Sequence, residues 1–331
     1  LLAGCGKSTG VGGPAGDAMP ATLQANAQMA TQLKLDDPQD FEDARRGLIA
    51  RPEGRIMSAD GSTVLIDFDA YKFVDGKAPP TVNPSLWRHA VLNAQIGLFK
   101  VTDGIWQLRG FDIANMTLIE GQTGFIVVDP RTARESASAA RAFARKHLGD
   151  KPVSGIVFTH SHADHFGGAL GVASAQEVAQ RKIPVVAPPL FNEAATTENV
   201  LVGTAMARRS MYQFGKNLER SPKGNVDTGL GKNAAYGAIG VLMPTQLITQ
   251  HEQELVIDGV RFVFHNVPGA EAPAELTFSI PDKKAYGGAE NLAQTMHNLL
   301  PVRGAKVRDS LQWSTYLQEA IDQLGDAEVY F

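Results

Sequence analysis

A short histidine-rich segment is the part of this sequence whose residue types and spacing could do chemistry. His160, His162, Asp164 and His165 fall within six residues, directly after the apolar run 155–158. Residues i and i+2 at the end of an extended strand point to the same side, so His160 and His162 can hold one metal ion together. A turn into a helix would then direct Asp164 and His165 toward a second position. Imidazole and carboxylate ligands suit Zn²⁺, and two ions about 3.5–4 Å apart can activate a shared hydroxide. The alternative interpretation is a surface histidine cluster without a metal.

Three or four ligands do not complete two metal sites, so further donors are expected downstream. The sequence offers His251, His265, Glu271, Glu275 and Glu290. Glu271 lies in a proline-bounded turn between two predicted strands, and Glu290 follows a strand-like stretch. Each of these carboxylates alone would more often be a solvated charge.

The elements that must position these residues follow from the hydrophobic pattern. Strands are predicted at 56–57 and 64–67 around the Asp60-Gly61 turn, and then at 98–101, 105–108, 116–120, 124–128, 153–158, 184–187, 254–267 and 275–280. Helices are predicted at 17–34, 133–147, 169–181 and 308–324, whereas 196–244 gives no clear pattern. Strand pairs followed by strand–helix alternation predict a sandwich of sheets flanked by helices.

The composition excludes several classes of protein. The chain has 331 residues, of which 44% are hydrophobic and 20% charged, which is enough to bury a core. Its formal net charge of −4 argues against a nucleic-acid-binding protein, which normally carries a positive patch. No apolar run reaches roughly 18 residues, so no membrane-spanning helix is expected. The single cysteine, Cys5, excludes disulfides within the chain.

Both ends of the sequence carry their own signals. The first five residues, Leu-Leu-Ala-Gly-Cys, resemble the cleavage box of bacterial lipoproteins, and a flexible Gly-rich tether follows Cys5. We therefore expect a membrane tether through acylated Cys5 and a periplasmic or cell-envelope location; an accidental run of small residues is the alternative. The apolar end 327–331 is typical of a strand that begins, so we expect the natural chain to continue beyond it. The expected organisation is a lipoprotein box and tether at 1–34, an N-terminal extension at 35–95, and a C-terminally incomplete catalytic domain at 96–331.

The motifs taken together resemble a known family. Residues 159–168, Thr-His-Ser-His-Ala-Asp-His-Phe-Gly-Gly, resemble the metallo-β-lactamase superfamily. Most of its members have a histidine at the next ligand position, where this sequence has Glu271. That substitution, with the segments 289–291, 295–299, 303–309 and 313–314, resembles the alkyl sulfatase group, over roughly residues 40–331. The resemblance implies an αββα sandwich of two mixed β-sheets flanked by helices.

The resemblance also implies a binuclear zinc site. It places His160, His162 and Glu271 on the first zinc, Asp164 and His165 on the second, and Glu290 between the two. A further histidine from beyond Phe331 would complete the second site. The same resemblance implies a homodimer and additional C-terminal domains in the complete protein.

A sulfate monoester needs fixed hydrogen-bond donors. Arg303 is the best candidate, because a guanidinium matches a tetrahedral oxyanion in a bidentate manner. The resemblance places Asn298 near the sulfate, His297 could protonate the leaving alkoxide, and Tyr236 is a weaker candidate donor. The alternatives are that 297–298 caps a helix and that Arg303 is a surface ion-pair residue. Asp129, at the end of a predicted strand, resembles the superfamily's supporting aspartate and is expected to orient the histidine segment without binding metal.

These features lead to one main functional hypothesis and two alternatives. The main hypothesis is zinc-dependent hydrolysis of alkyl sulfate esters, such as the detergent dodecyl sulfate, to alcohol and inorganic sulfate. One alternative is another hydrolase of the same fold acting on a lactam, thioester or phosphoester, although Glu271 argues against it. The other is an inactive, lipid-anchored binding protein.

Overall fold

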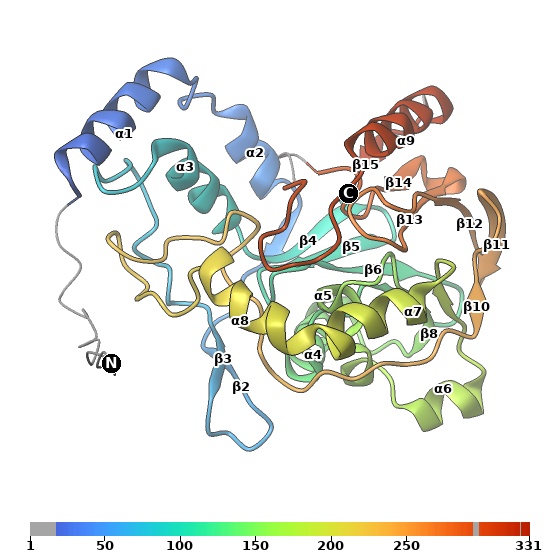
Figure 1. The fold of residues 1–331 in the computed structure, drawn as a ribbon. Coiled ribbons are helices and arrows are strands. Elements are labelled where there is room, and N and C mark those ends of the chain that lie inside the picture. The colour runs from blue at the N-terminus through green and yellow to red at the C-terminus, as the bar shows by residue number, and fades with distance from the viewer. Residues whose placement is uncertain (1–17, 294–297, 325) are drawn as a thin grey trace, which may run out of the picture.

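The structure is a computed structural model that describes residues 18–293, 298–324 and 326–331. Its centre is a sandwich of two β-sheets (Figure 1). In the described residues, the larger sheet has eight strands in the order β1-β4-β5-β6-β7-β8-β9-β10: β1 (Leu48–Ala50), β4 (Gly97–Thr102), β5 (Ile105–Arg109), β6 (Met116–Glu120), β7 (Phe125–Val128), β8 (Val153–Val157), β9 (Val185–Ala187) and β10 (Gln246–Leu247). The smaller sheet has the order β11 (Glu252–Ile257), β12 (Val260–Asn266), β13 (Leu276–Ile280), β14 (Ala285–Gly287) and β15 (Val329–Tyr330).

Both sheets mix antiparallel and parallel pairs. In the larger sheet β4 to β7 are antiparallel neighbours, whereas β7, β8, β9 and β10 run parallel. In the smaller sheet only the pair β14–β15 is parallel among the described strands. The carboxyl ends of parallel strands meet at one edge of a sheet. The segments that follow β7 and β8 therefore begin side by side.

The larger sheet is buried on both faces. Along β7, Phe125 and Val127 belong to the core beneath the helices, whereas Ile126 and Val128 belong to the core between the sheets. This alternation is the period of two expected of a strand. The inter-sheet core is completed by large side chains of the smaller sheet, which are Phe262, Phe264, Leu276, Phe278 and Ile280. The predicted two-sheet sandwich is confirmed.

Helices cover the sandwich on both sides (Figure 1). They are α1 (Pro20–Gln32), α2 (Gln39–Arg45), α3 (Pro84–Asn93), α4 (Arg134–Leu148), α5 (Ala163–Phe166), α6 (Ala175–Arg181), α7 (Phe191–Thr196), α8 (Gly203–Gln213) and α9 (Ser310–Gln323), with short 3₁₀ turns at Ala169–Gly171 and Pro281–Lys283 and a π-helical turn at Thr197–Leu201. Helix α4 packs its alanines on the larger sheet. Helix α9 packs Trp313 and Tyr316 against Val267 and Ala270, next to the smaller sheet. None of the helices in the described part of the chain is long and apolar enough to cross a membrane.

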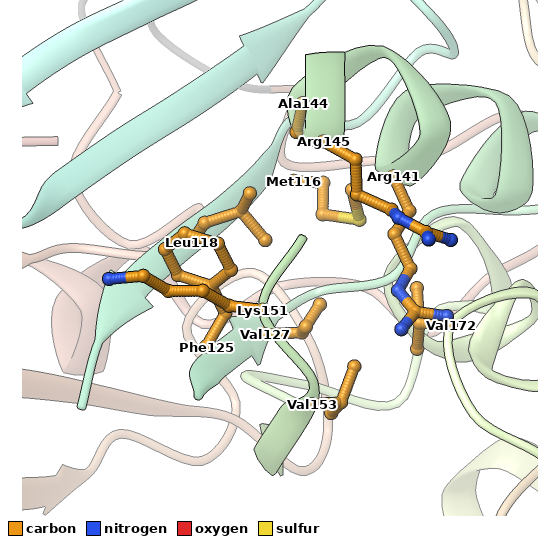
Figure 2. Close-up of a pocket in the computed structure, with 10 residues that line it drawn as sticks. All are labelled: Met116, Leu118, Phe125, Val127, Arg141, Ala144, Arg145, Lys151, Val153 and Val172. Atoms are coloured by element: carbon orange, nitrogen blue, oxygen red, sulfur yellow. The ribbon is translucent and has the colours of Figure 1, made fainter. Parts of the chain in front are cut away.

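The packing beneath α4 includes a small apolar cavity, which Figure 2 shows. Met116, Leu118, Val127 and Val153 lie in its wall, and the basic side chain of Arg141 lies at its side. Its volume of about 10 Å³ is room for roughly one water molecule. This cavity is therefore a packing defect and not a substrate site.

The N-terminal segment contributes the edge strand β1 to the larger sheet. β1 pairs with β4 as an edge strand, and β2 (Arg55–Met57) pairs with β3 (Val64–Asp67) as the predicted ribbon. Helix α3 starts at Pro84 with Asn83 as its cap, whose side chain accepts a hydrogen bond from the Ser85 amide. The sequence reading did not identify α2, α3 or β1. The domain boundaries at 34 and 95 remain predictions, and the Cys5 segment lies outside the described residues.

Two other element predictions were wrong in detail. The segment 169–181 is not one helix, because Ser174 caps a new helix, α6, by accepting a hydrogen bond from the Glu177 amide. The segment 254–267 is not one strand but the hairpin β11–β12. Asp258 and Gly259 turn the hairpin with φ of 45° and 78°, the backbone that an Asp-Gly turn favours.

Candidate metal centre

The histidine-rich segment lies at the shared carboxyl edge of β7 and β8. Val128 and Val157 are paired at the ends of these strands, so Asp129 directly neighbours the start of the segment. The chain continues extended to His162, which precedes the single helical turn α5. The His162 carbonyl accepts a hydrogen bond from the His165 amide at 3.1 Å. The predicted change from strand to helical turn is therefore confirmed.

Two glutamates from distant parts of the sequence converge on these histidines. Glu271 lies in the turn between β12 and β13, and Glu290 follows β14. One donor atom from each of His160, His162, Glu271 and Glu290 lies within 4.8 Å of the others, and the same holds for the group Asp164, His165 and Glu290. His160 Nε2 is 3.5 Å from one oxygen of Glu271 and 3.5 Å from one oxygen of Glu290. The structure thus brings all six candidate ligands together in two groups that share Glu290.

Asp129 fixes the orientation of two of the imidazoles. Its backbone has φ of 54°, an uncommon conformation for a residue with a side chain. Its carboxylate accepts hydrogen bonds from the Thr159 amide (2.8 Å), the Thr159 hydroxyl (2.6 Å) and His165 Nδ1 (2.8 Å). Because the hydroxyl proton goes to Asp129, Thr159 Oγ1 accepts from His160 Nδ1 at 3.0 Å. Both rings therefore carry a proton on Nδ1, which leaves Nε2 as the ligand atom.

His162 is oriented by a residue that sequence reasoning missed. Its Nδ1 lies 2.8 Å from Glu271 Oε2, and its Nε2 lies 3.4 Å from Glu198 Oε2. Glu198 is 7% exposed and belongs to the π-helical turn that follows α7. Burial lowers the pKa of His162 to about 4, so its ring is neutral, as a metal ligand must be. The segment 196–244 carried no periodic signal that would have pointed to Glu198.

Burial and crowded charge perturb the acidic groups of the site. Burial raises the pKa of Glu271 well above its usual range, and the neighbouring Glu290 adds to this effect. Burial also acts to lower the pKa of His165, but Asp129, Asp164 and Glu290 outweigh it and raise that pKa well above 6.5. Carboxylates held this close together repel one another when ionised, and a bound cation would relieve the repulsion.

The arrangement fits divalent metal ions. His165 Nε2 is buried, lies 3.5 Å from an oxygen of Asp164 and 3.5 Å from an oxygen of Glu290, and makes no hydrogen bond with any residue that the structure describes. Its Nδ1 proton is already held by Asp129, so Nε2 is the ring atom that faces the two carboxylates, and loss of its own proton would free it to bind a metal ion. A set of imidazole nitrogens and carboxylate oxygens is the donor chemistry of transition-metal sites.

Three other donors that the sequence offered do not join either group. The His265 ring lies on β12 and faces Glu252 at 3.7 Å, and the His251 ring faces Glu319 at 3.5 Å. The carboxylate of Glu275 is buried and accepts hydrogen bonds from the Glu271 amide (2.8 Å) and the Ala272 amide (3.1 Å). Glu275 therefore shapes the turn that carries Glu271.

Arg308 is a second residue to which the sequence reading gave no role. It is 6% exposed and forms an ion pair with Glu271 Oε1. Its Nε donates to the Glu271 carbonyl at 2.7 Å, and its Nη1 donates to Asn298 Oδ1 at 2.7 Å. One guanidinium thus connects a candidate ligand with a candidate sulfate-binding residue.

The remaining candidate substrate residues surround this arrangement. The positive charge of Arg303 adds to the lowering of the pKa of His162 by burial and opposes part of the rise in the pKa of Glu271. The backbone amide of Arg303 donates to Gln213 at 2.7 Å. Tyr236 is 46% exposed, and the partial burial of its hydroxyl raises its pKa, as do the charges of Asp112 and Asp164. His297 lies outside the described residues. The roles of these residues in substrate binding and catalysis remain predictions.

An open polar hollow adjoins the turn that carries Glu271. It has a volume of about 480 Å³ and is lined by residues 268–273 and by the segment Lys306 to Asp309, with Gln312 and Tyr316. Arg308 forms part of its wall. Solvent therefore reaches the outer side of the turn that carries Glu271.

The fold and the site define the class of protein. Residues 109–328 match the family described as the metallo-beta-lactamase superfamily. The chain belongs to this superfamily, as its histidine motif predicted.

Within that superfamily the chain is similar to alkylsulfatases. It is 43% identical over 92% of its length to an alkyl/aryl-sulfatase of Saccharomyces cerevisiae, and 42% identical over 93% to a linear primary-alkylsulfatase of a Pseudomonas species. It covers 47% and 46% of those two proteins. A solved structure of a stereoselective inverting sec-alkylsulfatase from Pseudomonas superposes with a TM-score of 0.93 and 41% identity, over 96% of this chain and 50% of that one. The chain therefore spans about half the length of the relatives it matches, and the predicted resemblance to the alkyl sulfatase group is confirmed.

Proposed function

We propose that the protein hydrolyses alkyl sulfate esters, such as dodecyl sulfate, to an alcohol and inorganic sulfate. The observation that carries the proposal is the meeting of Glu271 and Glu290 with His160 and His162 within 4.8 Å. Glutamate at position 271 is the feature that separated the alkyl sulfatase group from most of the superfamily. The similarity to curated alkylsulfatases over more than nine-tenths of the chain supports the same substrate class.

Zinc is the ion we propose for the site, because imidazole and carboxylate donors suit it. His160, His162 and Glu271 would hold one ion, Asp164 and His165 would hold the other, and Glu290 would lie between them. Such ions supply Lewis acidity and lower the pKa of water to near neutrality. The residues of this chain orient the metal ligands. Asp129 holds the Nδ1 proton of His165, Thr159 holds the Nδ1 proton of His160, and burial keeps His162 neutral.

The sulfate group would be held by donors beside the metal ligands. The guanidinium of Arg303, the amide of Asn298 and the hydroxyl of Tyr236 would bind the three terminal oxygens. His297 would donate a proton to the leaving alkoxide, which is otherwise a poor leaving group. These hydrogen bonds would give the oxyanion fixed donors.

Exposed apolar side chains flank the site and suit the alkyl tail. Ile239 is 59% exposed and packs beside Gly167, directly after α5, and Val241 is also exposed. Val200 and Leu201 follow Glu198 and are 71% and 74% exposed. We propose that these side chains cover part of the alkyl chain, whose burial is worth about 0.8 kcal/mol per methylene.

We further propose that Cys5 is acylated and tethers the protein in the cell envelope, and that the complete protein is a homodimer. Mass spectrometry of the N-terminal peptide from a membrane fraction tests the first proposal. Light scattering on the purified protein tests the second. An unmodified Cys5 in a soluble fraction would contradict the tether.

The substrate assay uses the protein expressed from its complete gene. Inorganic sulfate released from dodecyl sulfate is measured by ion chromatography, with and without a chelator, and a β-lactam substrate is tested in parallel. We expect sulfate release that stops on chelation, returns with zinc and falls strongly in Glu271→Ala. Bound zinc without sulfate release from any alkyl ester, or β-lactam hydrolysis alone, would refute the proposal.

A further inference from the structure

We propose that Arg308 is a positioning residue that locks the metal-ligand carboxylate of Glu271 and the amide of Asn298 into one unit. Through this unit it presents one oxygen of Glu271 to the metal site and the N–H donors of Asn298 to the sulfate. The proposal rests on the proposed function and deepens it, because it states how the metal and substrate sites are connected.

The backbone around Arg308 is tied to the two segments that it joins. The Arg308 amide donates to the Leu299 carbonyl at 3.0 Å, and the Asp309 amide donates to the Gly269 carbonyl at 3.1 Å. Asp309 then caps α9 through hydrogen bonds from the Leu311 and Gln312 amides. The position of the guanidinium is therefore fixed by a helix start on one side and by the Glu271 turn on the other.

The two oxygens of Glu271 have separate tasks. Oε1 pairs with the Arg308 guanidinium. Oε2 faces the histidines, at 2.8 Å from His162 Nδ1 and 3.5 Å from His160 Nε2. A carboxylate held on one oxygen cannot rotate freely, so Arg308 fixes the direction in which Oε2 points.

Arg308 also determines which way round the Asn298 amide lies. A guanidinium has only donors, so the Asn298 atom 2.7 Å from Nη1 must be the carbonyl oxygen. A second bond to the Asn298 backbone carbonyl holds the residue in place. The N–H donors of the amide therefore lie on the side away from Arg308. That orientation suits an oxyanion, and the reverse orientation would repel it.

The alternative is that Arg308 only stabilises the start of α9, and substitutions separate the two roles. Arg308→Lys keeps a positive charge but loses the planar fork, and Arg308→Ala loses both. Lys306→Ala is the matched control, because Lys306 is exposed, lines the same hollow and is not bonded to Glu271. Zinc affinity is measured by competition with a chromophoric chelator, and affinity for inorganic sulfate by calorimetry on the zinc-loaded protein.

We expect Arg308→Ala to lose about 10–100-fold in zinc affinity and roughly tenfold in sulfate affinity, with smaller losses for Arg308→Lys and none for Lys306→Ala. The 480 Å³ hollow beside Arg308 admits a small cation, so added guanidinium chloride at millimolar concentration should restore both affinities of Arg308→Ala, whereas sodium chloride should not. Wild-type affinities in Arg308→Ala and Arg308→Lys, or loss without guanidinium rescue in a folded variant, would overturn the proposal. Because these readouts are binding affinities, an inactive wild-type protein would refute the proposed function and leave this test valid.

Discussion

Replacing Asp129 with asparagine tests how the protein prepares its imidazoles for metal binding. The carboxylate accepts three hydrogen bonds, from the Thr159 amide, the Thr159 hydroxyl and His165 Nδ1. In Asp129, Oδ1 accepts from the Thr159 amide and Oδ2 accepts from the Thr159 hydroxyl and His165 Nδ1. The asparagine amide has only one oxygen, so it can replace only one of these two acceptors. If its NH₂ group faces His165, two donors meet and the ring must move its proton to Nε2, the atom that faces Asp164 and Glu290. If its NH₂ group faces the Thr159 amide, a buried donor loses its acceptor.

Either orientation of Asp129→Asn costs about 1–3 kcal/mol, the penalty for leaving one buried polar group unsatisfied. Substitutions of residues that orient metal ligands usually lower metal affinity by about 10–100-fold, and we expect a loss in that range. The assay is a competition titration with a chromophoric zinc chelator, combined with nitrogen NMR of the histidine side chains to read the tautomer of His165.

Asp258→Asn provides a matched control for this substitution. Asp258 also has a left-handed backbone, with φ of 45°, and accepts hydrogen bonds from the Thr123 and Gly124 amides and the Thr123 hydroxyl. It lies in the β11–β12 turn, away from the histidines, so zinc affinity should not change. If Asp129→Asn binds zinc within twofold of the wild type and keeps the Nδ1 proton on His165, the reasoning is refuted.

Three further predictions concern other parts of the molecule. Glu198→Ala should lower zinc affinity about tenfold through misorientation of His162, and Glu198→Gln should lose less because it still reaches Nε2; equal affinities for wild type and Glu198→Ala would contradict this role. Burial lowers the pKa of His265 below 6.5. Below pH 6.5 the unfolded chain therefore binds a proton that the folded chain does not, and the folded state becomes less stable as the pH falls. His265→Asn should therefore reduce the slope of unfolding free energy against pH by up to about 1.4 kcal/mol per unit below pH 6.5; urea titrations between pH 5 and 7.5 that give parallel curves would exclude this effect. Phe264→Ala should destabilise the sandwich by about 3–5 kcal/mol in chemical denaturation, because Phe264 is fully buried between the sheets; a loss below 1 kcal/mol would mean that the core collapses around the gap.

The local part of the site was predictable from the sequence. Spacing alone predicts that four ligand side chains converge, because a strand end followed by a helical turn determines where neighbouring side chains point. These are His160, His162, Asp164 and His165. The strands also followed from apolar runs, since β7 and β8 are buried on both faces.

The ligands that lie far along the sequence from the histidine segment could not be identified from local residue patterns. The flanking residues favoured Glu271 and Glu290 over Glu275, but only the family resemblance assigned them to the metal ions. Glu275 is as buried as Glu271, but it hydrogen-bonds the turn and does not join the cluster. The Asp-Gly turn at 258–259 was a local signal that the sequence reading overlooked.

Glu198 and Arg308 could not have been predicted by the same reasoning. Glu198 lies on a π-helical turn in a segment without apolar periodicity, so nothing marked it as buried. Arg308 acts across 37 positions of sequence on Glu271. Charged residues are mostly exposed, and only the fold shows that this one is enclosed with its partner.

The most direct test of the central claim is anomalous X-ray diffraction at the zinc edge from crystals of the protein grown with zinc. We predict anomalous peaks within coordination distance of His160, His162 and Glu271 and of Asp164 and His165, with Glu290 between them. Ordered crystals in which this cluster shows no peak, while zinc is bound elsewhere on the protein, would contradict the account.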